Sequence, residues 1–280
     1  EPLRKAQAAY SGGGFELAVI EARPPMEKIK LGLPGRDEEI DEVCALIRAM
    51  GELGIPVWCY EWMPVLNWIR TDLKLPSRGG ALVTGFDIRD SEKMPTIDVG
   101  DLTEDKLWEN LEYFLRKVVP VAEESGVSLA MHPDDPPISP VRGTPRIMRS
   151  IVAYDRLLDL VPSSVNGVAL CQGNFTLMTE DLPEAIRHFG SKKKIFFVHF
   201  RDVQGTAEHY QETFHDIGKT DMAECVRAYR DVGFDGICRP DHVPTMEGDN
   251  NDRPGYSSIG RLFAIGYIRG LIHAVYGKEQ

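Results

Sequence analysis

Four side chains that can bind transition metals stand at the ends of four successive apolar runs. They are His132, Cys171, His199 and Asp241. The intervals between them are 39, 28 and 42 residues, each about the length of one strand, one helix and two loops. In a parallel β/α barrel these positions meet at one rim, where one thiolate, two imidazoles and one carboxylate could hold Zn²⁺, Fe²⁺ or Mn²⁺. The spacing therefore predicts a metal centre.

Each of these residues alone has a plainer interpretation. A single histidine at a strand end is usually a hydrogen-bonded structural residue, and a single cysteine in an apolar strand is usually part of the core. The occurrence of four such residues at equivalent positions favours a shared site. The remaining cysteines are expected in the core: Cys44, Cys59, Cys225 and Cys238.

Two residues near the predicted ligands are candidates for proton transfer. His242 directly follows Asp241, and Tyr256 lies just beyond the polar loop GDNNDRPG. Ionisable groups beside a metal ligand are well placed to act as acid and base. The plainer alternatives are a surface histidine and a loop anchor. Three acidic residues could orient a ligating imidazole from behind, unless the first two simply form a proline-bounded turn: Asp134, Asp135 and Asp202.

Several arginines flank the same segments and could bind a substrate carboxylate with two parallel hydrogen bonds. The candidates are Arg142, Arg201, Arg239 and Arg253. We expect one or two of them to have this role. Trp58, Trp62 and Trp68 are expected to be packing residues, although the segment MPVLNW follows a strand and could reach the rim.

Six apolar runs predict parallel strands, because strands covered on both faces lack strict polar alternation. They are residues 16–21, 56–62, 128–132, 167–171, 195–200 and 236–238. Helical apolar stripes lie between them at residues 40–50 and 107–118, and residues 1–14 read as a helix that ends in glycines. Thr144 and Thr220 are predicted helix caps, and Gly54 and Gly126 are predicted helix ends.

Alternating strands and helices predict an α/β fold with a single domain over residues 1–280. The favoured architecture is a (β/α)8 TIM barrel, for which six strands are too few, so we expect that one or two N-terminal strands precede the given sequence. A doubly wound open sheet is the alternative. It would need a glycine-rich phosphate loop after the first strand, where this chain has EARPP.

Composition excludes several classes of function. The chain has 43 acidic and 32 basic residues, and its net charge of −11 opposes binding to nucleic acid. The apolar stretch 55–69 contains Glu61 and Asn67 and is shorter than the roughly 20 residues that a membrane span needs. Five cysteines without paired spacing fit a reducing cytoplasm. We expect a cytoplasmic protein with a small-molecule substrate.

Six strings in this order resemble the mannonate dehydratase family: WCYEWMPVLNWIRTDL, MHPDDPP, LCQGNF, VHFRDV, RPDHVP and RPGY. The resemblance covers nearly the whole chain. It implies a xylose-isomerase-like barrel, a divalent ion that is usually Mn²⁺, with Fe²⁺ or another transition metal as alternatives, and a homodimer. The implied activity is that of a lyase that converts D-mannonate to 2-keto-3-deoxy-D-gluconate in hexuronate breakdown.

The resemblance also implies roles for individual residues. His132, Cys171, His199 and Asp241 correspond to the metal ligands, His242 and Tyr256 to the catalytic pair, and Arg239 to an arginine beside the site. Two other functions remain open from the residues themselves. They are a sugar isomerase on the same barrel and a sugar-acid-binding protein without turnover. A DNA repair nuclease is disfavoured by the negative charge.

Overall fold

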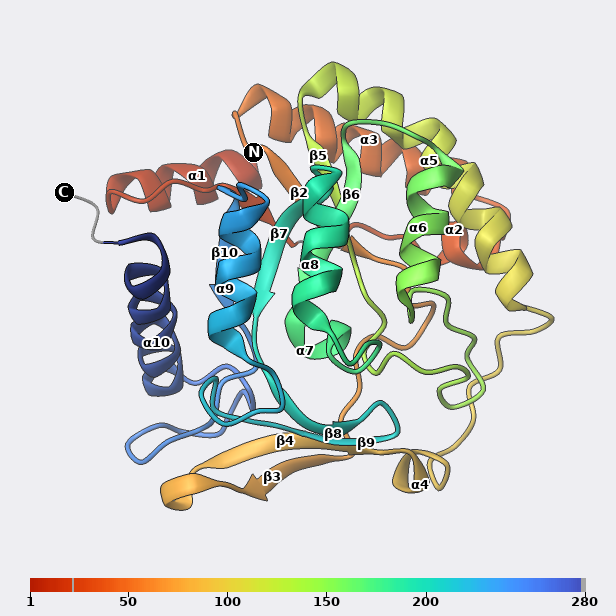
Figure 1. The fold of residues 1–280 in the computed structure, drawn as a ribbon. Helices are drawn as coiled ribbons and strands as arrows, with labels where there is room; N and C mark the ends of the chain where they lie inside the picture. The colour runs from red at the N-terminus through yellow and green to blue at the C-terminus, as the bar shows by residue number, and fades with distance from the viewer. Residues whose placement is uncertain (22, 278–280) are drawn as a thin grey trace.

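A parallel sheet of six strands curls into a nearly closed barrel with helices along its outside (Figure 1). The computed structural model describes residues 1–21 and 23–277. The strands follow one another around the sheet in chain order: β1 (Val19–Ile20), β2 (Val57–Glu61), β5 (Ser128–His132), β6 (Asn166–Cys171), β7 (Ile195–Phe200) and β10 (Ile237–Pro240). All six predicted strands are confirmed, and so is the α/β class.

Helices connect the strands and cover the outer face of the sheet. They are α1 (Pro2–Gly12), α2 (Glu27–Leu31), α3 (Arg36–Glu52), α5 (Glu104–Ser125), α6 (Ile151–Leu160), α7 (Gln172–Phe175), α8 (Leu182–Ser191), α9 (Met222–Asp231) and α10 (Ser258–Tyr276). Both predicted apolar stripes are buried, in α3 and α5. Gly54 and Gly126 follow these two helices at φ of 67° and 65°, which confirms the predicted ends.

Two predicted helix starts are wrong. Thr144 pairs with Val141 in a short antiparallel bridge, and α6 begins only after Ser150, whose side chain caps it. Helix α9 is capped by Asp221 and not by Thr220. Both true caps accept a hydrogen bond from the backbone N–H three residues later, as N-cap side chains do. Among the described residues, no helix combines the length and apolar character that crossing a bilayer requires.

Side chains of the barrel strands alternate between the helical layer and the barrel interior. Trp58 and Tyr60 point outward into the large core beneath the helices, while Val57 and Cys59 belong to a small separate cluster inside the barrel. The same interior cluster includes Ala130, Ala169 and Phe197. The next inward positions along the strands are therefore occupied by ionisable residues: Glu21, Glu61, His132, Cys171, His199 and Arg239.

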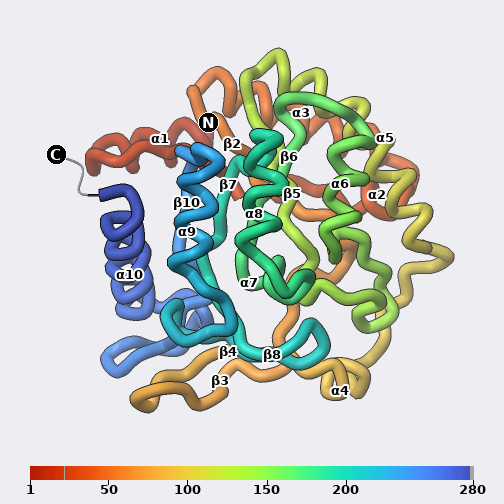
Figure 2. Tube along the Cα trace, viewed as in Figure 1, coloured from red at the N-terminus to blue at the C-terminus, as the bar shows by residue number. Residues whose placement is uncertain are grey.

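A second, antiparallel sheet lies across the end of the barrel toward which β7 points (Figures 1 and 2). Its strands are ordered β3 (Asp72–Pro76), β4 (Leu82–Asp87), β9 (His209–Glu212) and β8 (Val203–Thr206). The short helix α4 (Ile88–Ser91) follows β4. These strands were not among the predicted ones, because exposed strands of this kind carry no continuous apolar run. The sheet adds structure above the barrel mouth.

Candidate active site

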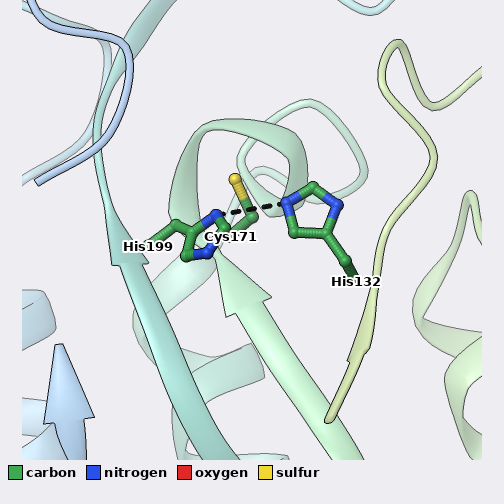
Figure 3. Close-up of side chains that lie close together, drawn as sticks. All are labelled: His132, Cys171 and His199. Carbon is green, nitrogen blue, oxygen red and sulfur yellow. Dashed lines mark hydrogen bonds between the residues drawn. The ribbon is translucent and has the colours of Figure 1, made fainter. Parts of the chain in front are cut away.

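Three of the four predicted ligands converge at the ends of neighbouring strands. The ligand atoms of His132, Cys171 and His199 lie within 4.8 Å of one another (Figure 3). His132 Nε2 is 3.2 Å from His199 Nδ1, so the two rings face each other. The fourth residue, Asp241, follows β10 and places Oδ2 3.6 Å from His199 Nδ1. Strand register explains the meeting, since Cys171 pairs with His199 between β6 and β7.

Both imidazoles are held at the ring nitrogen that points away from this cluster. His132 Nδ1 is 2.8 Å from the carbonyl oxygen of Pro133, and His199 Nε2 is 2.7 Å from Glu21 Oε1. Such contacts hold a proton on the outer nitrogen, so that the inner nitrogen of each ring can ligate a metal ion once it has lost its own proton. This is the usual arrangement of histidines that ligate metals in proteins.

The acidic residues that we expected behind the histidines have other partners. Asp134 accepts a hydrogen bond from Met148 N at 2.7 Å, and Asp202 accepts one from Thr220 N at 3.0 Å. Asp135 binds arginine side chains and does not contact a ligating imidazole. The prediction that these residues orient the imidazoles is wrong. Glu21, which sequence reasoning missed, has that position behind His199.

The cluster of candidate ligands is electrostatically prepared for a cation. Burial raises the pKa of a thiol, but Arg201 and hydrogen bonds with His132 and His199 outweigh it and lower the pKa of Cys171 to about 6. Burial likewise opposes ionisation of Asp241, but its pKa is held well below the usual range by neighbours that include His242 and Arg239. A thiolate and a carboxylate therefore stand beside two imidazoles, a donor set that fits a divalent transition ion.

The predicted proton-transfer pair is also brought together. Tyr256 Oη is 3.3 Å from His242 Nε2, and His242 Nε2 is 3.6 Å from Asp241 Oδ2. Trp68 packs its ring edgewise against His242, with ring centres 5.2 Å apart. Burial lowers the pKa of His242 and raises that of Tyr256, so a neutral imidazole and a phenol face each other.

The backbone at His242 has an unusual conformation. Its φ is +45°, in the left-handed region that residues other than glycine adopt at a cost of about 1–3 kcal/mol. Gly255 packs against the ring, because a Cβ at that position would lie 3.4 Å from His242 Nδ1. The peptide N–H of Val243 also donates to the carbonyl of Gly255 at 2.8 Å. These contacts fix the ring of His242 above the cluster of candidate ligands.

The predicted arginines occupy three different environments. Arg239 lines the cavity and makes ion pairs with Glu21 and Asp241. Arg201 is 1% exposed and is held by the buried carboxylates of Asp135 and Glu212. Arg142 lines a different depression, where its Nε donates to the carbonyl of Pro95 at 2.9 Å. The structure therefore does not bring Arg142 to the cavity that Arg239 lines.

The site opens into a cavity of about 240 Å³. Sequence reasoning overlooked several residues of its wall: Glu21, Arg23, Cys59 and Glu61. Cys59 is a core residue, as predicted, and it also lies inside the barrel near Glu21 and His199. Strand parity is the signal that could have identified Glu21 and Glu61, since each is the next inward position of its strand.

Gly173, the glycine of the string LCQGNF, lies where there is no room for a side chain. A side chain at Gly173 would place its Cβ 2.2 Å from Arg201 Nε. The turn after Cys171 can therefore pass this close to the Arg201 guanidinium only without a side chain. This close approach keeps Arg201 near the Cys171 thiol, whose pKa it lowers.

Structural comparison shows the same fold in several sugar enzymes. A mannonate dehydratase from Streptococcus suis serotype 2 superposes with a TM-score of 0.92 and 34% identity, covering 99% of this chain and 82% of that one. An L-ribulose 3-epimerase superposes with a TM-score of 0.63 over 97% of this chain and 80% of that one. Its 13% identity shows a shared fold alone. The barrel is thus of the xylose-isomerase-like type.

Sequence comparison gives a narrower result. The mannonate dehydratase of Thermotoga neapolitana is 37% identical, covering 100% of this chain and 87% of its own length. That of Thermotoga maritima is 36% identical, covering 98% and 86%. The family model described as D-mannonate dehydratase (UxuA) matches residues 1–102 and 97–280. The chain therefore belongs to the D-mannonate dehydratase family.

Proposed function

We propose that this protein is a hydro-lyase that dehydrates D-mannonate to 2-keto-3-deoxy-D-gluconate with a bound divalent transition ion. Mn²⁺ is the first candidate ion and Fe²⁺ the second. The observation that carries the proposal is the convergence of His132, Cys171 and His199 beside the His242–Tyr256 pair in one cavity. Relatives over 30% identical across the chain are named mannonate dehydratase.

The reaction needs one base and one acid. The C2 proton of D-mannonate is α to the carboxylate, and C3 carries the hydroxyl that leaves as water. Removing the C2 proton and protonating the departing hydroxyl gives an enol, which takes a proton at C3 and becomes the 2-keto product. His242 and Tyr256, with Nε2 and Oη 3.3 Å apart, supply the base and the acid.

The proposed ligands of the ion are His132, Cys171, His199 and Asp241. When bound, a divalent ion supplies Lewis acidity toward substrate oxygens, which favours loss of the C2 proton. The protein's own part is to keep these donors ready. Glu21 and the Pro133 carbonyl orient the imidazoles, and Arg201 favours the thiolate.

The substrate carboxylate is bound by positively charged side chains of the cavity wall. Arg239 is already balanced by ion pairs with Glu21 and Asp241. Arg23 Nε lies 4.0 Å from Glu61 Oε1, an oxygen that Lys30 Nζ already contacts at 2.9 Å. Arg23 is therefore better able to accept a second anion, and we assign it the substrate carboxylate. We also propose that the reaction belongs to hexuronate breakdown and takes place in the cytoplasm.

The first test is conversion of D-mannonate by the Mn²⁺-loaded protein under anaerobic conditions. We expect 2-keto-3-deoxygluconate to form, activity to disappear with a chelator, and Mn²⁺ or Fe²⁺ to restore it. D-Xylose and D-mannose serve as controls, because an isomerase would act on these neutral sugars. Ketose formation from either sugar, without product from D-mannonate, would contradict the proposal.

Cys171→Ser should weaken metal binding, because a hydroxyl stays protonated where the thiol of Cys171 ionises. We expect at least a tenfold rise in the dissociation constant for Mn²⁺, measured by calorimetry or by metal content after dialysis. Cys44→Ser is the matched control, since Cys44 is buried on α3 away from the cavity. Equal metal binding by both variants would remove Cys171 from the ligand set.

His242→Asn should lower kcat by about 10²- to 10⁴-fold without loss of metal, since it removes one partner of the proton-transfer pair. Tyr256→Phe should have an effect of similar size. Exchange of the C2 proton in deuterium oxide then separates the two roles, because a variant that exchanges without forming product has kept the base. His209→Asn, at an exposed position, is the control. Full activity of His242→Asn would refute the assigned role.

Arg23→Gln should raise KM for D-mannonate by about 10- to 100-fold and change kcat little, because a charged hydrogen bond to substrate is lost from both ground and transition states. Arg23→Lys should recover part of the affinity. Arg116→Gln, on the exposed face of α5, is the control. An unchanged KM in Arg23→Gln would assign the carboxylate to another cation.

A further inference from the structure

Two residues from outside the barrel strands meet the far side of the His242 ring. Arg70, just before β3, places Nη2 3.4 Å from His242 Nδ1. Glu212, the last residue of β9, places Oε1 3.5 Å from the same nitrogen. Both come from segments bordering or forming the second sheet. The proposed chemistry uses the opposite nitrogen, Nε2, which faces Tyr256.

The hydrogen bonds that Arg70 Nη2 already makes decide which neighbour bonds to His242 Nδ1. Arg70 Nη2 carries two hydrogens, and it has short contacts to two carboxylate oxygens, 2.9 Å to Asp135 Oδ2 and 2.6 Å to Glu212 Oε1. These charged bonds are stronger than a 3.4 Å contact to a neutral ring nitrogen. Both hydrogens of Arg70 Nη2 are therefore used in bonds to Asp135 and Glu212. His242 Nδ1 is left to carry a hydrogen toward Glu212.

Glu212 is also suited to accept a hydrogen bond from His242. It is 1% exposed, and among the described residues its Oε2 has no hydrogen-bond partner. Burial raises its pKa to about 7, although Arg201 and Arg70 act in the opposite direction. A buried carboxylate with spare hydrogen-bonding capacity beside an imidazole resembles the acid that orients histidine in hydrolase triads.

We propose that Glu212 is a positioning residue for the dehydration, one that binds Nδ1–H of His242 and so directs Nε2 toward Tyr256 and the substrate. The inference rests on the proposed function and names a residue that acts through His242. The carboxylate stabilises the imidazolium that exists while His242 holds a transferred proton. The 3.5 Å separation shortens in that charged state, as catalytic contacts often do.

A purely structural role for Glu212 makes different predictions. Arg70 and Arg201 are balanced by Asp135 and Glu212 in a buried network, to which Tyr210 adds a 2.7 Å hydrogen bond from its hydroxyl to Asp135. Loss of any member can lower stability. Of Asp135, Tyr210 and Glu212, only Glu212 contacts His242 Nδ1. Tyr210→Phe is therefore the matched control, because Tyr210 lies on the same strand and in the same network without contacting His242.

The test compares Glu212→Gln, Glu212→Asp and Tyr210→Phe in the Mn²⁺-loaded enzyme. We expect Glu212→Gln to lower kcat by about 10- to 100-fold, with KM and metal content unchanged. Glu212→Asp keeps the charge and should recover part of the rate. Tyr210→Phe should lower the melting temperature but keep kcat within about twofold. Equal kcat values in Glu212→Gln and Tyr210→Phe would overturn the proposal.

A second measurement does not depend on turnover. In metal-free protein labelled with ¹⁵N-histidine, His242→Asn identifies the Nδ1–H resonance of His242. Glu212→Gln should move this resonance upfield, because an amide is a weaker acceptor than a carboxylate, and Tyr210→Phe should leave it in place. An unmoved resonance in Glu212→Gln would refute the contact. If the wild-type protein fails to convert D-mannonate but the resonance moves, the contact stands and the proposed function fails.

Discussion

The strict alternation of side chains along parallel strands is the constraint on which the site depends. Val57, Ala130, Ala169 and Phe197 point into the barrel and fill its lower part, so the next inward positions near the strand ends have no apolar neighbours above them. Ionisable side chains at those positions face one another across the barrel. A one-residue slip of β6 or β7 would send Cys171 or His199 into the helical layer instead. Register and chemistry are therefore linked.

Charge placed inside a barrel must be balanced locally, since burying an unpaired charge costs several kcal/mol. This protein balances its charges in two tiers. Arg70 and Arg201 offset Asp135 and Glu212 in a buried network beside the cavity. Nearer the cavity, Arg239 joins Glu21 and Asp241. The thiol of Cys171 adds negative charge that these pairs leave unmatched, which is why the inner cluster suits a divalent cation.

The features of this fold that depend on sequence pattern could be predicted, whereas those that depend on tertiary contacts could not. The six strands could be predicted because strands buried on both faces are continuous apolar runs. The convergence of His132, Cys171 and His199 followed from their equal places at strand ends. Glu21 could not be assigned to His199, since the two are 178 residues apart and nothing local couples them. The second sheet and the contacts of Arg142 were missed because exposed strands and loops carry little periodic signal.

The second sheet supplies contacts to the site that the barrel strands alone would not provide. Tyr210 and Glu212 are buried and alternate on β9 with the exposed His209 and the half-buried Gln211, so only Tyr210 and Glu212 enter the buried network. Arg70 enters the same network from the segment before β3. The barrel thus supplies the metal donors, and the second sheet supplies the surroundings of His242. Positions far from the strand ends can therefore alter proton transfer without touching the metal ligands. Substitutions in β3, β4, β8 and β9 can change the reaction rate through the surroundings of His242.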